Sequence, residues 1–144
     1  VVGGPGGRHR NSTDSAIVLE HRESGLRAQA SERRSQAENM QVALQRLRFE
    51  LAIAVRCDAT DVPSPLLRDR VLHGRVMLSV DHIDYPLLLA EILDFIYRDQ
   101  GDLSGIAEAL ATTPSQIIRT LKKYPPALAL VNRWRRDTQR SELR

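Results

Sequence analysis

The first residues of the chain have the composition of a loop that could stabilise negative charge. Residues 3–7 read Gly-Gly-Pro-Gly-Gly, and residues 8–15 that follow are all polar. Four glycines around a proline cannot form a regular element, so we expect a flexible loop. Because Gly6 and Gly7 have no Cβ, a reacting group can come close to the backbone there, and a backbone N–H can donate to its oxyanion. The chemistry that this segment favours is therefore electrostatic stabilisation by the main chain.

The elements that must position this loop follow it directly. Ser15–Glu20 has an apolar centre and Leu26–Ala30 alternates apolar with polar residues, so two strands are predicted around a turn at 21–25. Ser35–Arg56 is the strongest helical segment, because its apolar residues follow helical spacing: Met40, Ala43, Leu44, Leu47, Leu51 and Ala54. Ser35 and Glu38 have the spacing of a capping box at its start. We expect a small sheet with one long helix across it.

Two motifs in this region resemble a known family. Residues 4–16 read Gly-Pro-Gly-Gly-Arg-His-Arg-Asn-Ser-Thr-Asp-Ser-Ala. The segment resembles the Gly-Pro-Gly-Gly-Gln loop of the peptide chain release factors and of their small stalled-ribosome rescue relatives. The helix start resembles the family's Arg-Ser-Gln-x-x-Asn helix, at the expected distance, through Arg34, Ser35, Gln36, Asn39, Ala43, Leu47 and Arg48. Two separated motifs in the right order are more specific than either alone. The resemblance covers residues 1–57, and it points to the small, codon-independent type because the codon-reading domain has no room here.

The resemblance implies an activity and a set of residues. The implied activity is binding to the ribosomal A site and promotion of peptidyl-tRNA ester hydrolysis, in translation termination or stalled-ribosome rescue. The implied catalytic residues are Gly6, Gly7 and Arg8, with Arg8 acting through its backbone amide. The residues expected to contact rRNA are His9, Arg10, Arg33, Arg34, Arg133, Arg135 and Arg136. The residues expected to support the loop and helix are Asn11, Ser15, Ser35, Gln36 and Asn39.

Arg8 departs from the family pattern, which has glutamine at this position. The backbone donor survives the change, but the compact neutral amide that helps to place water does not. Three interpretations follow: an enzyme active through its backbone amide, a ribosome-binding paralogue that no longer hydrolyses, or a change introduced in cloning.

The rest of the chain is expected to be mostly helical. Asp58–Pro65 contains two prolines and two acids and is predicted to be a linker, so that residues 66–144 form a second, all-helical domain. A short strand is predicted at Val76–Val80. Helices are predicted from Tyr85, over Leu103–Leu110, from Thr113 to Lys123, and over Ala127–Arg136. The predicted fold class is α+β.

Residues 103–123 resemble a helix-turn-helix. In that arrangement Ile117, Ile118 and Leu121 face inward, and the residues that face outward, where a recognition helix reads a DNA groove, are Ser115, Gln116, Arg119 and Thr120. A helical bundle that uses the same apolar positions for packing alone is the alternative. We expect docking on the ribosome rather than base-specific DNA binding, aided by Lys122, Lys123 and the tail.

Composition limits the remaining possibilities. The chain has 144 residues, 42% of them hydrophobic, and Cys57 is the single cysteine, which excludes a disulfide scaffold and a multi-cysteine zinc site. Nineteen of the 21 basic residues are arginines. The tail from 133 to 144 has five of them against Asp137 and Glu142, so it accounts for the whole net charge of +3. Arginine matches phosphate geometry, so a polyanionic partner is favoured. We expect a soluble cytoplasmic protein with no cofactor, no metal and no membrane partner.

Overall fold

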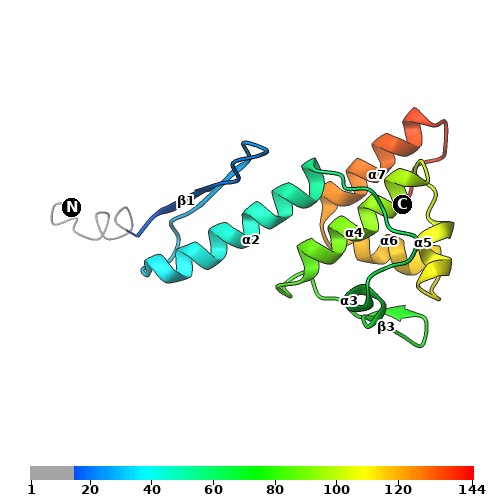
Figure 1. Cartoon of the computed structure of the whole chain (residues 1–144), viewed down its shortest axis with the longest axis horizontal. Helices are drawn as coiled ribbons and strands as arrows, with labels where there is room; N and C mark the ends of the chain where they lie inside the picture. Colours follow the sequence, from blue (N-terminus) through cyan, green and yellow to red (C-terminus); the bar gives the residue numbers. More distant parts are fainter. Residues whose placement is uncertain (1–14) are drawn as a thin grey trace. The chain divides into compact units, whose positions relative to one another are not determined.

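A computed structural model describes residues 15–144 of the chain. The fold is α+β, as predicted, and the chain divides into two compact units, residues 1–51 and 52–144. Figure 1 shows the helices and strands of the chain, coloured along the sequence.

The first unit contains a β-hairpin. Strands β1 (Ile17–Glu20) and β2 (Arg27–Ala30) pair antiparallel, with Ile17 opposite Ala30 and Glu20 opposite Arg27. Gly25, at φ 75°, lies in the connecting turn, where the left-handed backbone suits glycine. Along β2 the residues alternate between exposed and more buried, and Ala30 is the most buried of them. The predicted hairpin is confirmed.

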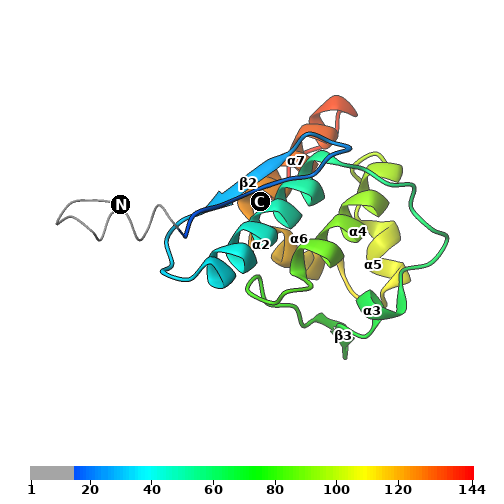
Figure 2. The same cartoon turned by 60° about the vertical axis from the view of Figure 1, so that its left-hand side comes forward.

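The long helix α2 (Gln36–Ala54) follows the hairpin and runs alongside it (Figure 2). Ser35 caps its start, because the Ser35 Oγ accepts hydrogen bonds from the backbone N–H groups of Ala37 (3.1 Å) and Glu38 (3.3 Å). Ala43 and Leu47 are buried, as the helical spacing predicts. Met40 and Ala54 are exposed, so assigning them to the apolar stripe was wrong.

The second unit is mainly helical. Its elements are α3 (Pro65–Arg68), β3 (Val71–Leu72), β4 (Arg75–Val76), α4 (Tyr85–Arg98), α5 (Ser104–Ala109), α6 (Pro114–Lys122) and α7 (Pro125–Asp137). Helix α4 lies at the centre and contacts α5 and α7, while α6 contacts α5, α7 and β4. Its core is apolar, with fully buried side chains that include Tyr85, Leu89, Ile92, Leu93, Phe95, Ile96, Ile106, Ile117, Leu121 and Val131.

Strand β4 corrects one sequence prediction. Only Val76 of the predicted strand 76–80 is in a strand, and it pairs with Val71 of β3. His73 (φ 52°) and Gly74 (φ 76°) form the two-residue turn between β3 and β4. Positive φ at both positions is the signature of a tight type I′ hairpin, which spacing of apolar residues alone does not reveal. Among residues 15–144, no helix is long and apolar enough to cross a membrane.

Candidate functional site

The residues predicted to do the chemistry lie at the start of the chain. Gly6, Gly7, Arg8, His9, Arg10 and Asn11 are outside the described residues. Ser15, the first described residue, lies eight residues after Gly7 and two residues before the start of β1. The structure therefore describes the elements that follow these residues in the chain.

Ser15, Arg33 and Asn39 form a hydrogen-bonded cluster, called here the loop anchor. The Asn39 Nδ2 donates to the backbone carbonyls of Ser15 (2.7 Å) and Arg33 (3.0 Å). The Asn39 Oδ1 accepts from the Arg33 N–H (3.0 Å), and the Ser15 Oγ donates to the Arg33 carbonyl (3.0 Å). The cluster ties Ser15, just before β1, to the turn that leads into α2.

Two of the three residues of the loop anchor, Ser15 and Asn39, are buried, which makes their hydrogen bonds necessary. Asn39 is fully buried and Ser15 is 4% exposed. A buried amide costs free energy unless its donors and acceptor are paired, and here both Asn39 donors and its oxygen have backbone partners. Asn39 faces inward because it lies four residues before Ala43 and eight before Leu47, on the buried stripe of α2.

The predicted residues near the anchor take different places. Ser15 and Asn39 meet directly, and Ser35 caps α2. Gln36 is the first residue of α2 and is exposed. The backbone of Arg33 belongs to the anchor, while the side chains of Arg33 and the neighbouring Arg34 are exposed, and in the described part of the chain neither guanidinium belongs to an ion pair. They remain available to a phosphate, and their predicted contact with rRNA stays a prediction.

One ion pair in this unit was not predicted from the sequence. Arg46 of α2 pairs with Glu32 and also donates from Nη1 to the Gln29 carbonyl of β2 (2.7 Å). The hydrogen bond from Arg46 lowers the pKa of the exposed Glu32 carboxyl from 4.5 to about 2. The sequence signal is weak, because the partners are 14 residues apart on different elements.

The predicted basic tail is folded onto the helical unit. Two hydrogen bonds join Asn132 to Leu143. The Asn132 Nδ2 donates to the Leu143 carbonyl (3.1 Å), and the Leu143 N–H donates to the Asn132 Oδ1 (2.7 Å). Arg135 donates to the carbonyls of Gly101 (2.6 Å) and Ser141 (2.5 Å), and Arg136 pairs with Glu142. Arg133 is exposed. Of the three tail arginines predicted to bind rRNA, two are thus engaged within the fold.

The helix-turn-helix segment forms its helices but not its predicted reading face. Thr113 caps α6, with its Oγ1 accepting from the Gln116 N–H (3.3 Å), and Ile117 and Leu121 are buried as predicted. Thr120 was predicted to face outward and is 1% exposed; its carbonyl accepts from the Tyr85 hydroxyl (2.6 Å). Gln116 accepts from the Val76 N–H (3.2 Å) through Oε1. Ser115 and Arg119 are exposed.

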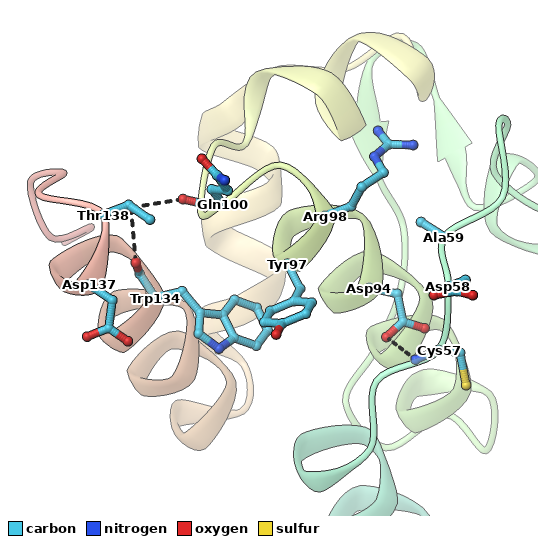
Figure 3. A pocket seen from close by; sticks show the side chains of 10 residues that line it. All are labelled: Cys57, Asp58, Ala59, Asp94, Tyr97, Arg98, Gln100, Trp134, Asp137 and Thr138. Atoms are coloured by element: carbon cyan, nitrogen blue, oxygen red, sulfur yellow. Dashed lines mark hydrogen bonds between the residues drawn. The ribbon is translucent and has the colours of Figure 1, made fainter.

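An open pocket of about 520 Å³ lies within the second unit (Figure 3). The rings of Tyr97 and Trp134 meet there at 5.1 Å between centroids. Asp94 accepts from the Cys57 N–H (3.2 Å) and pairs with Arg56 at 3.0 Å. Burial raises the pKa of Asp94 and lowers that of Arg56, which lies over the Trp134 ring. The ion pair joins the segment after α2 to α4 and so has a structural explanation.

Acidic and histidine side chains do not gather into a metal site anywhere in residues 15–144. The Asp81–Asp84 segment leads into α4 as a turn, with the His82 Nδ1 accepting from the Asp84 N–H (3.0 Å). Arg70 contacts His82 Nε2 (3.1 Å) and Asp84 (3.7 Å).

Comparison with known proteins addresses the first part of the chain. Residues 2–63 match the family model of the RF-1 domain. The N-terminal region contains an RF-1 domain. The match takes in both motifs that carried the resemblance to release factors, residues 4–16 and 34–48, and also the hairpin between them.

Individual relatives of the RF-1 domain are release factors. The chain is 38% identical over 83 residues to peptide chain release factor 1 of Rhodospirillum rubrum, which is 58% of this chain and 23% of that protein. It is 50% identical over 48 residues to peptide chain release factor 2 of an Acidovorax species, covering 33% of this chain and 13% of the relative. It is 46% identical over 48 residues to mitochondrial peptide chain release factor 1 of Mus musculus, covering 33% and 11%. The chain spans less than a quarter of the length of these curated relatives. No solved structure matches it significantly.

Proposed function

We propose that this protein binds the ribosome and promotes hydrolysis of the peptidyl-tRNA ester. The observation that carries the proposal is the match of residues 2–63 to the RF-1 domain model. It is supported by the loop anchor, which holds Ser15 beside the turn that leads into α2. A catalytic loop works only if its donors are held where charge develops, and a buried, fully paired Asn39 is a rigid base for it.

In this mechanism water attacks the ester carbonyl and negative charge develops on its oxygen. The backbone N–H of Arg8 donates to that oxygen, while Gly6 and Gly7 let the main chain approach. Loss of one such donor costs about 10² to 10³ in rate. Arg33 and Arg34, exposed beside the loop anchor, contact rRNA phosphates.

Arg8 supports a second candidate, a ribosome-binding protein that does not hydrolyse. A charged side chain in place of the motif glutamine changes how water is placed beside the ester. The protein would then occupy ribosomes through the same domain without releasing the peptide.

Peptide release from purified ribosomes separates these functions. The native protein and Arg8→Gln are compared on ribosomes stalled at a stop codon, on truncated messages and with an empty A site. Release by the native protein supports the hydrolase, and the ribosomal complex that it prefers assigns termination or rescue. Release by Arg8→Gln alone supports the non-hydrolysing candidate. Release by neither, on any complex, contradicts the proposed function.

A further inference from the structure

The β3–β4 hairpin lies against α6 through contacts that the helix-turn-helix pattern does not predict. Thr112 Oγ1 donates to the Gly74 carbonyl (2.5 Å), the Val76 N–H donates to Gln116 Oε1 (3.2 Å), and Lys123 Nζ donates to the Leu78 carbonyl. Successive points along 74–78 therefore meet successive points along 112–123. The two segments run side by side for the whole length of α6.

This pairing places the main chain at Arg75 alongside α6, which carries Arg119 and Lys122 and is followed by Lys123. These four residues are called here the hairpin–helix surface. Arg75 lies between two residues that contact the α5–α6 segment, Gly74 and Val76. Arg119 follows Gln116 by one helical turn, and Lys123 follows Arg119 by another. Arg75, Arg119 and Lys122 are exposed.

The hairpin–helix surface has no acid within the segments that build it. Residues 70–80 and 109–136 contain neither aspartate nor glutamate, although the chain has 18 acids in all. Among the ion pairs of the described residues, none includes Arg75, Arg119 or Lys122. The tail differs, because its Arg136 is paired with Glu142.

The cations of this surface also act on one another. Burial lowers the pKa of Lys123, and the nearby charge of Arg119 lowers it further. The helix C-terminus favours positive charge, which explains why cations are tolerated in the last turn of α6. It does not explain Arg75, which lies on a different element. An uncompensated positive surface is a site for a polyanion.

We propose that the hairpin–helix surface binds the phosphate backbone of RNA without reading base sequence. Two of the four side chains that a recognition helix would present are unavailable, since Gln116 holds the hairpin and Thr120 is buried. The cations of the surface remain available. Contacts from arginine and lysine to phosphate position a protein on a nucleic acid without reading its base sequence. The choice of RNA over other polyanions rests on the proposed function, which places the chain on the ribosome.

The test measures binding of the full chain to an RNA duplex of about 16 base pairs, long enough to present successive minor grooves. The surface variant combines Arg75→Gln, Arg119→Gln and Lys122→Gln. A matched control removes the same charge from exposed positions outside both the surface and the tail, with Arg22→Gln, Arg27→Gln and Arg68→Gln. Unchanged melting temperatures confirm that both variants fold.

The surface variant is expected to bind the duplex roughly tenfold more weakly at ~100 mM salt, with a salt slope smaller by about 2 to 3, and equally for unrelated sequences. The control is expected to stay within about twofold of the native protein, because scattered charges release few counterions. Equal losses in both variants, or a preference for one sequence, would overturn the inference. So would a surface variant that keeps duplex binding but loses ribosome binding, which would indicate an acidic protein partner.

A release assay separates this inference from the proposed function. If no form of the protein releases peptide while the surface variant still weakens RNA binding, the proposed hydrolysis fails and the RNA surface stands. If release occurs and the surface variant binds RNA like the native protein, the inference fails alone.

Discussion

The two units hold their shape by different means. In the second unit, large apolar side chains from several helices are completely buried around α4. In the described part of the first unit, the buried apolar residues are small or few, Ala30, Ala43 and Leu47, and Ser15 and Asn39 are buried with them. A hydrophobic core tolerates many sequences of similar volume, whereas a polar cluster needs each partner. The polar contacts of the first unit therefore fix the positions of its residues, whereas the apolar core of the second unit supplies most of the free energy of folding.

The largest expected effect comes from the apolar core. Leu93→Ala removes a fully buried side chain of α4 and should destabilise the second unit by about 2–5 kcal/mol through lost burial and a residual cavity. Denaturant unfolding measures the change. Leu87→Ala, at a position 59% exposed on the same helix, should cost about 0.5 kcal/mol or less. Equal costs would contradict the assignment of the core.

The loop anchor should give the next largest effect. Asn39→Ala removes three hydrogen bonds, including the one that the Arg33 N–H donates, at a cost of about 1–3 kcal/mol. Amide hydrogen exchange should show faster exchange of the Arg33 N–H and slow exchange retained in α4. Gln41→Ala, exposed on the same helix, is the control. If the Arg33 N–H exchanges as slowly in Asn39→Ala as in the native protein, the proposed role of the loop anchor is contradicted.

The buried hydroxyl of Tyr85 tests how much one polar contact adds to the stability of the second unit. Tyr85→Phe removes the hydrogen bond to the Thr120 carbonyl and keeps the ring in the core, so we expect a loss of about 1 kcal/mol. Burial raises the pKa of this hydroxyl, so Tyr85 should not ionise where exposed tyrosines do. Ultraviolet titration together with denaturant unfolding checks both. Tyr97→Phe, at a ring 53% exposed, should leave stability nearly unchanged.

The smallest effect concerns Glu32 and Arg46. Because the folded-state pKa of Glu32 is lowered to about 2 from 4.5, the stability that this pair adds is fully present above pH 4.5 and is lost as pH falls toward 2. An NMR titration of the Glu32 carboxyl measures it. In Arg46→Gln the midpoint should move up toward 4.5. A native midpoint near 4.5 would show that the pair does not form in solution.

The sequence predicted the elements better than it predicted which polar side chains they use. Apolar spacing located α4, α6 and α7, because a buried stripe repeats with the helical period. It could not predict that Asn39 meets Ser15, since a contact between residues 24 apart depends on how α2 lies along the hairpin. Thr120 was misplaced for a related reason. Its hydroxyl donates to the Gln116 carbonyl within α6, so a polar residue became compatible with a buried position.

The hairpin–helix surface could not be predicted from the sequence, because the β3–β4 hairpin leaves no recognisable pattern in it. Each strand has two residues, too few for an alternating pattern, and its turn depends on positive φ at His73 and Gly74. The cations were visible in the sequence, but their shared surface exists only because the hairpin lies along α6.

Peptide release at increasing protein concentration tests most directly whether chemistry and docking belong to different units. The assay uses whichever of the native and Arg8→Gln proteins is active. Gly6→Ala is expected to lower the maximal rate about 10²-fold through misplacement of the loop, with half-saturation unchanged. The triple variant at Arg75, Arg119 and Lys122 is expected to raise half-saturation roughly tenfold with the maximal rate unchanged. If the triple variant lowers the maximal rate as Gly6→Ala does, chemistry and docking do not belong to different units, and the account is contradicted.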